Sequence, residues 1–156
     1  MSNPEKTTSE NENEFVIFLI GEQEYCIDIM SLREIRGATT PTALPDSPPY
    51  VKGVINLRGA VVPIIDLATR LGLTPSMQTD RSVIMITNIG EQLIGLSADA
   101  VLDILAINLE TIQPTPAVQA QDGSRFVSGL VALNERMISV VDLVSILPAN
   151  IQEEAA

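Results

Sequence analysis

The side chains that could carry out chemistry are few in this chain of 156 residues. It contains no histidine, which excludes a Ser-His-Asp triad, a histidine general base and most zinc or iron sites. Its one cysteine, Cys26, lies in the alternating segment EYCIDI, where a small buried hydrophobic residue is a better explanation than a nucleophile. The glycine-rich phosphate-binding motifs G-x-x-x-x-G-K-[ST] and G-x-G-x-x-G are both absent from the sequence. Catalysis by paired carboxylates is the one class that these exclusions leave open, but little in the sequence favours it. We therefore expect no catalytic residue, no metal and no cofactor.

The acidic and basic residues are unevenly distributed along the chain. The net charge is −11, which opposes non-specific binding to nucleic acid or to an anionic membrane. The segment from Met30 to Pro75 nevertheless has five basic and three acidic side chains. A basic segment in an acidic molecule is typical of a docking surface for an acidic protein partner, although a few solvated arginines on loops would give the same count.

The elements that must position these side chains are short strands. The apolar runs EFVIFLI and EYCIDIM flank Gly21-Glu22-Gln23 and predict a β-hairpin. GVINL and AVVPII flank Arg58-Gly59 and predict a second hairpin, in which Pro63 favours an edge strand or a bulge. The segment MSLREIRG fits one helical turn or a short strand equally well.

Two aspartates mark the expected helices. Asp66 begins DLATRLG, and we expect it to cap a short helix that directs Leu67 and Leu71 inward and ends at Gly72. Asp142 begins DLVSIL and predicts a terminal helix of the same kind.

The chain repeats its own pattern. GVINLRGAVVPIIDLATRL (53–71) aligns without a gap on GLVALNERMISVVDLVSIL (129–147) at a constant offset of 76, which superimposes Gly53 on Gly129. The turn at 21–23 recurs as Gly90-Glu91-Gln92 at an offset of 69. This ordered repetition predicts two similar small barrels related by a pseudo-two-fold axis.

The repeat divides the chain into halves at about residues 14–72 and 81–147. Each half is marginal as an independent domain, so we expect an apolar interface between the barrels. We expect a disordered lead over residues 1–13, one domain of two barrel subdomains over 14–150, and a polar tail over 151–156.

EYCIDIMSLREIRG, followed by PYVKGVINLRGAVVPIIDL, resembles the CheW family, the coupling proteins of bacterial chemotaxis. The resemblance continues through GLSADAVLDIL, IQPTP, FVSGLVAL and RMISVVDLVSIL, and covers about residues 14–148. It implies a mainly β fold of two intertwined five-stranded SH3-like barrels, between which strands can be exchanged. The short helices would follow Asp66 and Asp142.

The resemblance also implies the function. Members of the family are non-enzymatic adaptors that couple methyl-accepting chemoreceptors to the histidine kinase CheA. The implied partners are the regulatory domain of CheA and the cytoplasmic tip of the receptors, with no nucleic acid and with the membrane reached only through the receptors. An alternative is the same module in another array-like pathway, such as one that controls surface motility. The implied location is the cytoplasm, with which a single unpaired cysteine agrees.

Partner-binding positions follow from the same motifs. In the segment LREIRG and the block KGVINLRG these are Leu32, Glu34, Ile35, Arg36, Lys52, Gly53 and Arg58. Ile29, Val101 and Ile104 lie beside the expected junction of the barrels and are candidates for a groove that grips a receptor's helical hairpin. Core packing remains the default explanation for each of these apolar residues.

For two of these positions, Arg58 and Gly53, a structural explanation competes with a role in partner binding. Arg58 is either a solvated turn residue or a guanidinium directed at a carboxylate, which would be a partner's or that of Glu34. Gly53 either meets a backbone requirement at the start of a strand or lets a partner's backbone approach closely.

Overall fold

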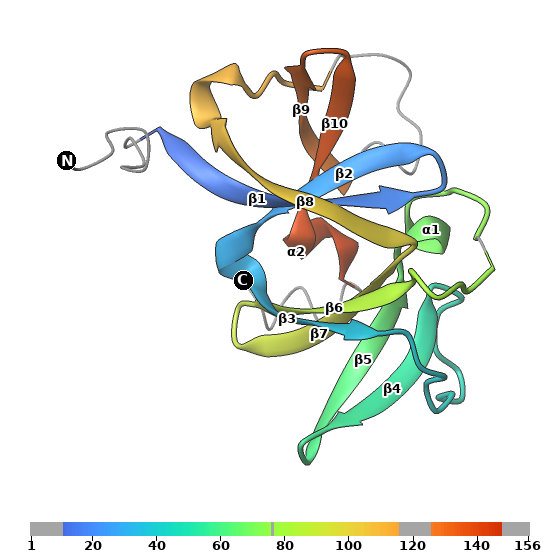
Figure 1. Ribbon diagram of the computed structural model, residues 1–156. Helices are drawn as coiled ribbons and strands as arrows, with labels where there is room; N and C mark the ends of the chain where they lie inside the picture. The colour runs from blue at the N-terminus through green and yellow to red at the C-terminus, as the bar shows by residue number, and fades with distance from the viewer. Residues whose placement is uncertain (1–10, 76, 116–125, 148–156) are drawn as a thin grey trace.

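The computed structural model describes residues 11–75, 77–115 and 126–147, which form two five-stranded sheets and little helix (Figure 1). Most of the expected lead and all of the expected tail lie outside the described residues. β1 begins at Glu12, inside the expected lead, because its backbone pairs with β8 at Glu12 and Asn13 whatever the polarity of the side chains.

The elements follow one another in the order that the repeat predicts. They are β1 (Glu12–Ile20), β2 (Gln23–Asp28), η2 (Ile29–Ser31), β3 (Leu32–Gly37), β4 (Val51–Leu57), β5 (Ala60–Asp66), α1 (Leu67–Arg70), β6 (Val83–Ile89), β7 (Gln92–Ala98), β8 (Ala100–Asn108), η3 (Leu109–Thr111), β9 (Val127–Leu133), β10 (Arg136–Val141) and α2 (Leu143–Ile146). The ambiguous segment MSLREIRG contains both η2 and β3, and so has a helical turn as well as a strand.

The two sheets have the same topology. Their strand orders are β8-β1-β2-β10-β9 and β3-β6-β7-β5-β4, which become identical when each strand is replaced by its counterpart in the other half. We call the first sheet barrel A and the second barrel B. Barrel A takes β1 and β2 from the first half and β8, β9 and β10 from the second, and barrel B has the reverse composition. The exchange of these hairpins is the intertwining that the resemblance implied.

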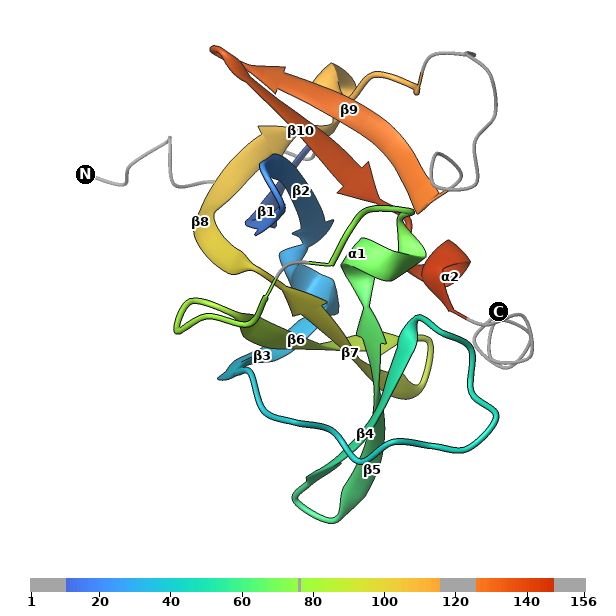
Figure 2. The ribbon, with the colours of Figure 1, turned by 90° about the vertical axis from the view of Figure 1, so that its right-hand side faces the viewer.

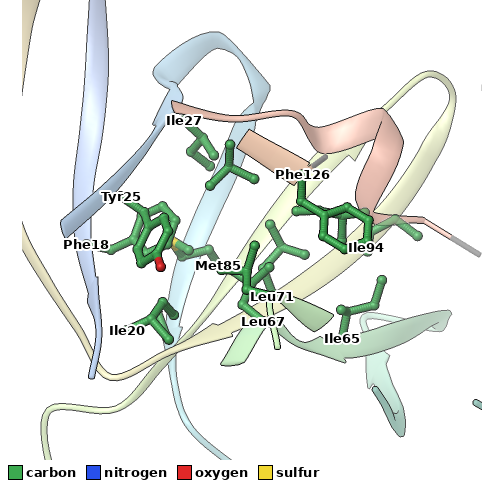
Figure 3. Close-up of a cluster of buried hydrophobic side chains, with 14 of the residues drawn as sticks. Phe18, Ile20, Tyr25, Ile27, Ile65, Leu67, Leu71, Met85, Ile94 and Phe126 are labelled. Atoms are coloured by element: carbon green, nitrogen blue, oxygen red, sulfur yellow. The ribbon is translucent and has the colours of Figure 1, made fainter. Parts of the chain in front are cut away.

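Three apolar clusters hold this arrangement together. Barrel A encloses a small core that includes Phe15, Ile17 and Cys26, and barrel B encloses another around Val62 and Ile64. The largest cluster lies between the barrels and has 18 buried residues drawn from both; we call it the seam core (Figure 3). Since each barrel's own core has only five or six buried residues, most of the apolar burial depends on the two barrels staying together.

The predicted hairpins are confirmed. β1 pairs with β2 across Gly21, and β6 pairs with β7 across Gly90; the φ angles of these glycines are 63° and 64°. A positive φ angle favours glycine, which accounts for the recurring glycine at the first position of each turn.

Pro63 was expected on an edge strand or at a bulge, but its strand, β5, lies inside the sheet between β7 and β4. β5 pairs with both β4 and β7, but its pairing with β7 covers only Ile64 to Asp66. Pro63 therefore lies in the part of β5 that has a single neighbouring strand, where its missing N–H leaves no gap in a ladder.

The two helices occur where predicted, but the aspartate side chains do not cap them in the expected way. Asp66 and Asp142 occupy the N-cap positions, and their carboxylates accept hydrogen bonds from the Thr69 and Ser145 hydroxyls at 2.9 and 2.8 Å rather than from backbone N–H groups. Leu67 and Leu71 are buried as predicted, and Gly72 ends α1 with a φ angle of 81°. No helix in the described residues is long and apolar enough to span a membrane.

Candidate partner-binding site

β3 is an edge strand whose side chains are divided between two faces by a bulge. The register with β6 shifts between Leu32 and Glu34, so Leu32 and Ile35, three residues apart, both lie on the seam-core side of the strand. Glu34 and Arg36 lie on the opposite face, toward the core of barrel B. The bulge therefore separates the apolar candidates of this segment from the charged ones.

Glu34 is the centre of a small ionic cluster. Its carboxylate accepts a hydrogen bond from the Arg58 guanidinium and lies 3.5 Å from Nη1 of Arg36. The hydrogen bond from Arg58 and the charges of both arginines hold the pKa of Glu34 below its ordinary value. Of the two predicted partners for Arg58, the intramolecular carboxylate is thus present.

The backbone of Arg58 is unusual for an arginine. Arg58 and Gly59 form the two-residue turn between β4 and β5, with φ angles of 50° and 91°. Glycine and asparagine tolerate this left-handed conformation better than arginine does. The side chain of Arg58 remains 69% exposed while it contacts Glu34. The geometry of the turn therefore does not explain why position 58 is an arginine. The exposed guanidinium is the feature that glycine or asparagine would lack.

Lys52 and Gly53 lie next to each other on β4 but differ in accessibility. Lys52 is exposed, whereas Gly53 is buried beneath the connector that follows β3. A Cβ atom on Gly53 would lie 2.2 Å from the carbonyl oxygen of Thr42, and the φ angle of Gly53 is 145°. This contact within the chain meets the backbone requirement that the sequence suggested, while a role of Gly53 at a partner interface stays a prediction.

The apolar candidates are Ile29, Leu32, Ile35, Val101 and Ile104, which we together call the seam strip. Ile29, Leu32 and Val101 pack against the seam core, while Ile35 and Ile104 are 41% and 49% exposed. β8 has a bulge like that of β3, which brings Val101 and Ile104 to the same face. β3 and β8 lie on one side of the molecule, away from α1 and α2 (Figure 2). Whether this strip forms a groove for a helical hairpin stays a prediction.

A second ionic cluster, which was not predicted from the sequence, lies at the equivalent position of barrel A. Arg136, the first residue of β10, donates from Nη2 to Oε1 of Glu24 at 2.6 Å and lies 3.4 Å from Oδ1 of Asp103. These contacts, led by the hydrogen bond to Glu24, raise the pKa of Arg136. Asp103 corresponds to Glu34 at the offset of 69 that relates the first turns. Extending that alignment by one strand would have matched Asp103 with Glu34, but it would not have revealed Arg136 or Glu24, whose counterparts are Ala60 and Leu93.

The two barrels differ strongly in charge. The described residues of barrel A and its flanking segments (11–28, 99–115 and 126–147) include ten acidic side chains and one basic side chain, Arg136. The described residues between 29 and 98, which contain barrel B, include five acidic and six basic side chains. The basic segment seen in the sequence is therefore one barrel of an otherwise acidic molecule.

A cavity of about 260 Å³ opens in barrel B between the connector after β3 and the loop after α1. Its lining includes Lys52, Asp66 and Asp99. Both carboxylates are engaged within the protein, since Asp66 accepts from the Thr69 hydroxyl and Asp99 accepts from the N–H of Gly21 at 2.6 Å. Cys26 lies elsewhere, fully buried in barrel A, where burial raises the pKa of its thiol to about 12, as expected for a core residue.

These features define a class of protein. Two SH3-like barrels share one core, and three accessible candidate side chains, Ile35, Ile104 and Arg58, lie on the edge strands β3 and β8 and on the turn between β4 and β5. This arrangement is typical of a protein that recognises other proteins through its surface.

Comparison with known proteins identifies the family. The model of the CheW-like domain matches residues 14–150, so the chain belongs to the CheW-like family. It is 46% identical over the full length of both chains to a probable chemotaxis protein CheW of Rhizobium etli. It is also 43% identical to the chemotaxis protein CheW of Rhizobium meliloti, over 99% of this chain and all of that one. The crystal structure of the scaffolding protein TtCheW of Thermoanaerobacter tengcongensis matches with a TM-score of 0.77 and 33% identity, over 83% of this chain and 88% of that one.

The family membership and these relatives establish the general function. The chain is a non-catalytic coupling adaptor of chemotaxis signalling.

Proposed function

We propose that this adaptor bridges the cytoplasmic tip of methyl-accepting chemoreceptors to the regulatory domain of the histidine kinase CheA. The observation that carries the proposal is that the repeat-equivalent surfaces of the two barrels have diverged. One rigid body therefore offers different chemistry to different partners.

The first surface belongs to barrel B and consists of Glu34, Arg36, Lys52 and Arg58. The Arg58 guanidinium contacts Glu34 yet is largely exposed, so its N–H donors are already oriented before a partner binds. Lys52 is exposed and makes no ion pair with a described residue. This surface suits a partner that presents carboxylates.

The second surface belongs to barrel A and lies around the turn between β9 and β10. Its arginine, Arg136, is already engaged by two carboxylates, so the surface offers acidic and apolar groups instead. Met137 is 59% exposed there, at the position equivalent to Val61 of barrel B. The seam strip adds an apolar edge suited to a helical hairpin.

A rigid body with two different surfaces allows weak contacts to add. Once one partner is bound, the other surface is presented at a high effective concentration to the second partner. The assembly can then be stable although each pairwise affinity is modest. The proposed location is the inner face of the membrane, where the receptors place their tips.

The experiment measures the binding of two variants to isolated receptor tip and to isolated kinase regulatory domain, at low and high salt. Arg58→Glu reverses a charge on the first surface, and Met137→Lys places a charge on the second. Asn134, in the turn itself, is a less suitable position, because its φ angle of 55° would strain the backbone of a bulky replacement. Each variant should weaken a different binary interaction, and the one that depends on Arg58 should be the more salt-sensitive.

Arg81→Glu is the matched control, because Arg81 is an exposed arginine outside both surfaces. It makes the same charge change as Arg58→Glu and should leave both interactions intact. Loss of the same single interaction in Arg58→Glu and Met137→Lys would refute the two-surface proposal, and wild-type protein that binds neither partner would refute the bridging function itself.

A further inference from the structure

Arg70, the last residue of α1, lies between two aromatic rings that come from different halves of the chain. Its guanidinium carbon is 3.9 Å from the centre of the Tyr50 ring and 4.6 Å from the centre of the Phe126 ring. Phe126 is almost completely buried, while Tyr50 and Arg70 are half-buried. A partly desolvated arginine between two ring faces is a stronger contact than an exposed one.

The same guanidinium binds the end of α2. Nε donates to the carbonyl oxygen of Ile146 at 2.7 Å, and Nη2 donates to those of Leu147 and Ser145 at 3.1 and 3.4 Å. Carbonyls in the last turn of a helix have no N–H partner within that helix, so a side-chain donor satisfies them. Arg70 thus connects α1 of one half to α2 of the other.

The position of this contact follows from the pseudo-two-fold symmetry. Tyr50 and Phe126 are equivalent at the offset of 76, and their carbonyl oxygens accept from the backbone N–H groups of Asp66 and Asp142 at 2.7 and 2.8 Å. The residue equivalent to Arg70 is Ile146, which is fully buried. One arginine therefore joins equivalent parts of both repeats, and no second copy of it exists in α2.

The seam core alone holds the two barrels together, but it does not fix the angle between them equally well. Burial of apolar surface is non-directional, so it favours association over one particular orientation. A planar guanidinium with fixed donors and two stacked rings has a defined geometry that a rotation of one barrel would break.

We propose that Arg70 fixes the orientation of barrel A relative to barrel B, and that this fixed orientation is needed for both partner surfaces to be engaged at once. Arg70 is a positioning residue, since it touches neither proposed surface. The second part of the proposal rests on the proposed function, whereas the first part does not.

The first part is tested by distance measurement between spin labels on the two barrels. Glu22→Cys and Glu91→Cys place labels on the exposed, repeat-equivalent turns of β1–β2 and β6–β7. The native Cys26 stays unlabelled, because it is fully buried. Otherwise unaltered protein should give one narrow distance distribution. Arg70→Leu should widen or shift it, Arg70→Lys should do so less because it keeps the charge without the fork, and Arg81→Leu should leave it unchanged.

The second part is tested by comparing binary with ternary binding. In Arg70→Leu, the affinity for receptor tip alone and for kinase regulatory domain alone should stay within about twofold of wild type, while capture of the two together falls about tenfold or more. A residue that only stabilises the fold would leave this ratio unchanged at temperatures well below the melting transition. Arg70→Lys should recover part of the ternary capture.

The outcomes separate the proposal from the function on which it partly rests. An unchanged distance distribution in Arg70→Leu would overturn the orienting role, and a widened distribution with normal ternary capture would overturn its importance for assembly. Wild-type protein that binds neither partner would refute the bridging function, yet the label distances would still decide the orienting role. If Arg70→Leu does not fold, Tyr50→Leu removes one ring only and is expected to give the same widening to a smaller degree.

Discussion

Arg58 occupies a backbone conformation that costs an arginine free energy, and it does so at the tip of an otherwise ordinary hairpin. Local strain of this kind persists where the side chain contributes something that the favoured residue would not. The equivalent residue in the other barrel is Asn134, which has nearly the same φ angle and suits it. The comparison leads to the prediction that the Arg58 guanidinium has a role in partner binding.

Arg58→Asn should therefore separate stability from partner binding. The melting temperature should equal or exceed that of the wild type, because relief of the turn opposes the loss of an exposed ion pair. Affinity for the partner of the first surface should fall about tenfold or more, as is common when an interface arginine is removed. Thermal melting and titration with each partner are the measurements. Unchanged affinity would leave Arg58 as a solvated turn residue.

Glu34 gives a prediction about pH. Its pKa is lowered below the ordinary 4.5 in the folded protein, chiefly by the Arg58 hydrogen bond. The contribution of this pair to stability is therefore fully present above the ordinary pKa and is lost as the pH falls through the lowered value. NMR titration of the Glu34 carboxyl should show the lowered pKa in the wild type and a return toward 4.5 in Arg58→Asn. The same pKa in both proteins would contradict the contact.

At the scale of the elements, the two connectors that precede β4 and β9 explain a glycine in each repeat. Thr42 forms a bridge with Val54, and Gln113 forms one with Leu130, so each connector lies across the start of a strand. Gly53 and Gly129 lie beneath these crossings, where a side chain has no room. The repeated glycine is thus a consequence of repeated close packing.

Substitution of these glycines should be graded by geometry. Gly53→Ala combines a backbone clash with a positive φ angle and should cost about 2–4 kcal/mol in the free energy of unfolding. Gly129→Ala has no such φ angle and meets the side chain of Ile112 and the carbonyl of Gln113, so it should cost about 1–3 kcal/mol. Gly37→Ala is the control, since nothing lies within 4 Å of its added Cβ atom, and its effect should stay within about 0.5 kcal/mol. Urea unfolding would test the order, and equal losses at all three sites would contradict the packing explanation.

At the scale of the whole molecule, the exchange of hairpins makes the halves dependent on each other. Each half contributes two strands to one barrel and three to the other, so neither half contains a complete sheet. The seam core, with its 18 buried residues, is also built from both.

Fragments 1–78 and 79–156, divided in the exposed loop before β6, should each lack a cooperative thermal transition. Mixed in equal amounts, they should form a 1:1 complex that regains the β circular dichroism and a cooperative melt, because only together do they complete both barrels. Sedimentation and circular dichroism are the measurements. A first fragment that melts cooperatively as a monomer would show that the exchange is not required for folding.

The local elements and the class of protein were predictable from the sequence alone. Gly21, Gly90 and the Arg58-Gly59 pair mark turns whose backbone angles depend on nearest neighbours, so the hairpins could be located. Asp66 and Asp142 marked the helix starts for the same reason. Their carboxylates, however, accept hydrogen bonds from side-chain hydroxyls and not from the backbone N–H groups that were expected. The absence of histidine and the buried Cys26 pattern removed most catalytic chemistry, and the resemblance carried by the EIRG and GVINLRG segments supplied the family.

The way in which these elements combine depends on contacts that appear only in the folded molecule. Which barrel receives each hairpin is set by pairings such as β1 with β8, between residues far apart in the chain, to which local propensity is blind. The bulges in β3 and β8 redirect Ile35 and Ile104 against strict alternation, because register is set by the neighbouring strand. The contacts of Arg70 with α2 and of Arg136 with Glu24 join residues more than 70 positions apart, and they exist only because the folded barrels bring these residues together.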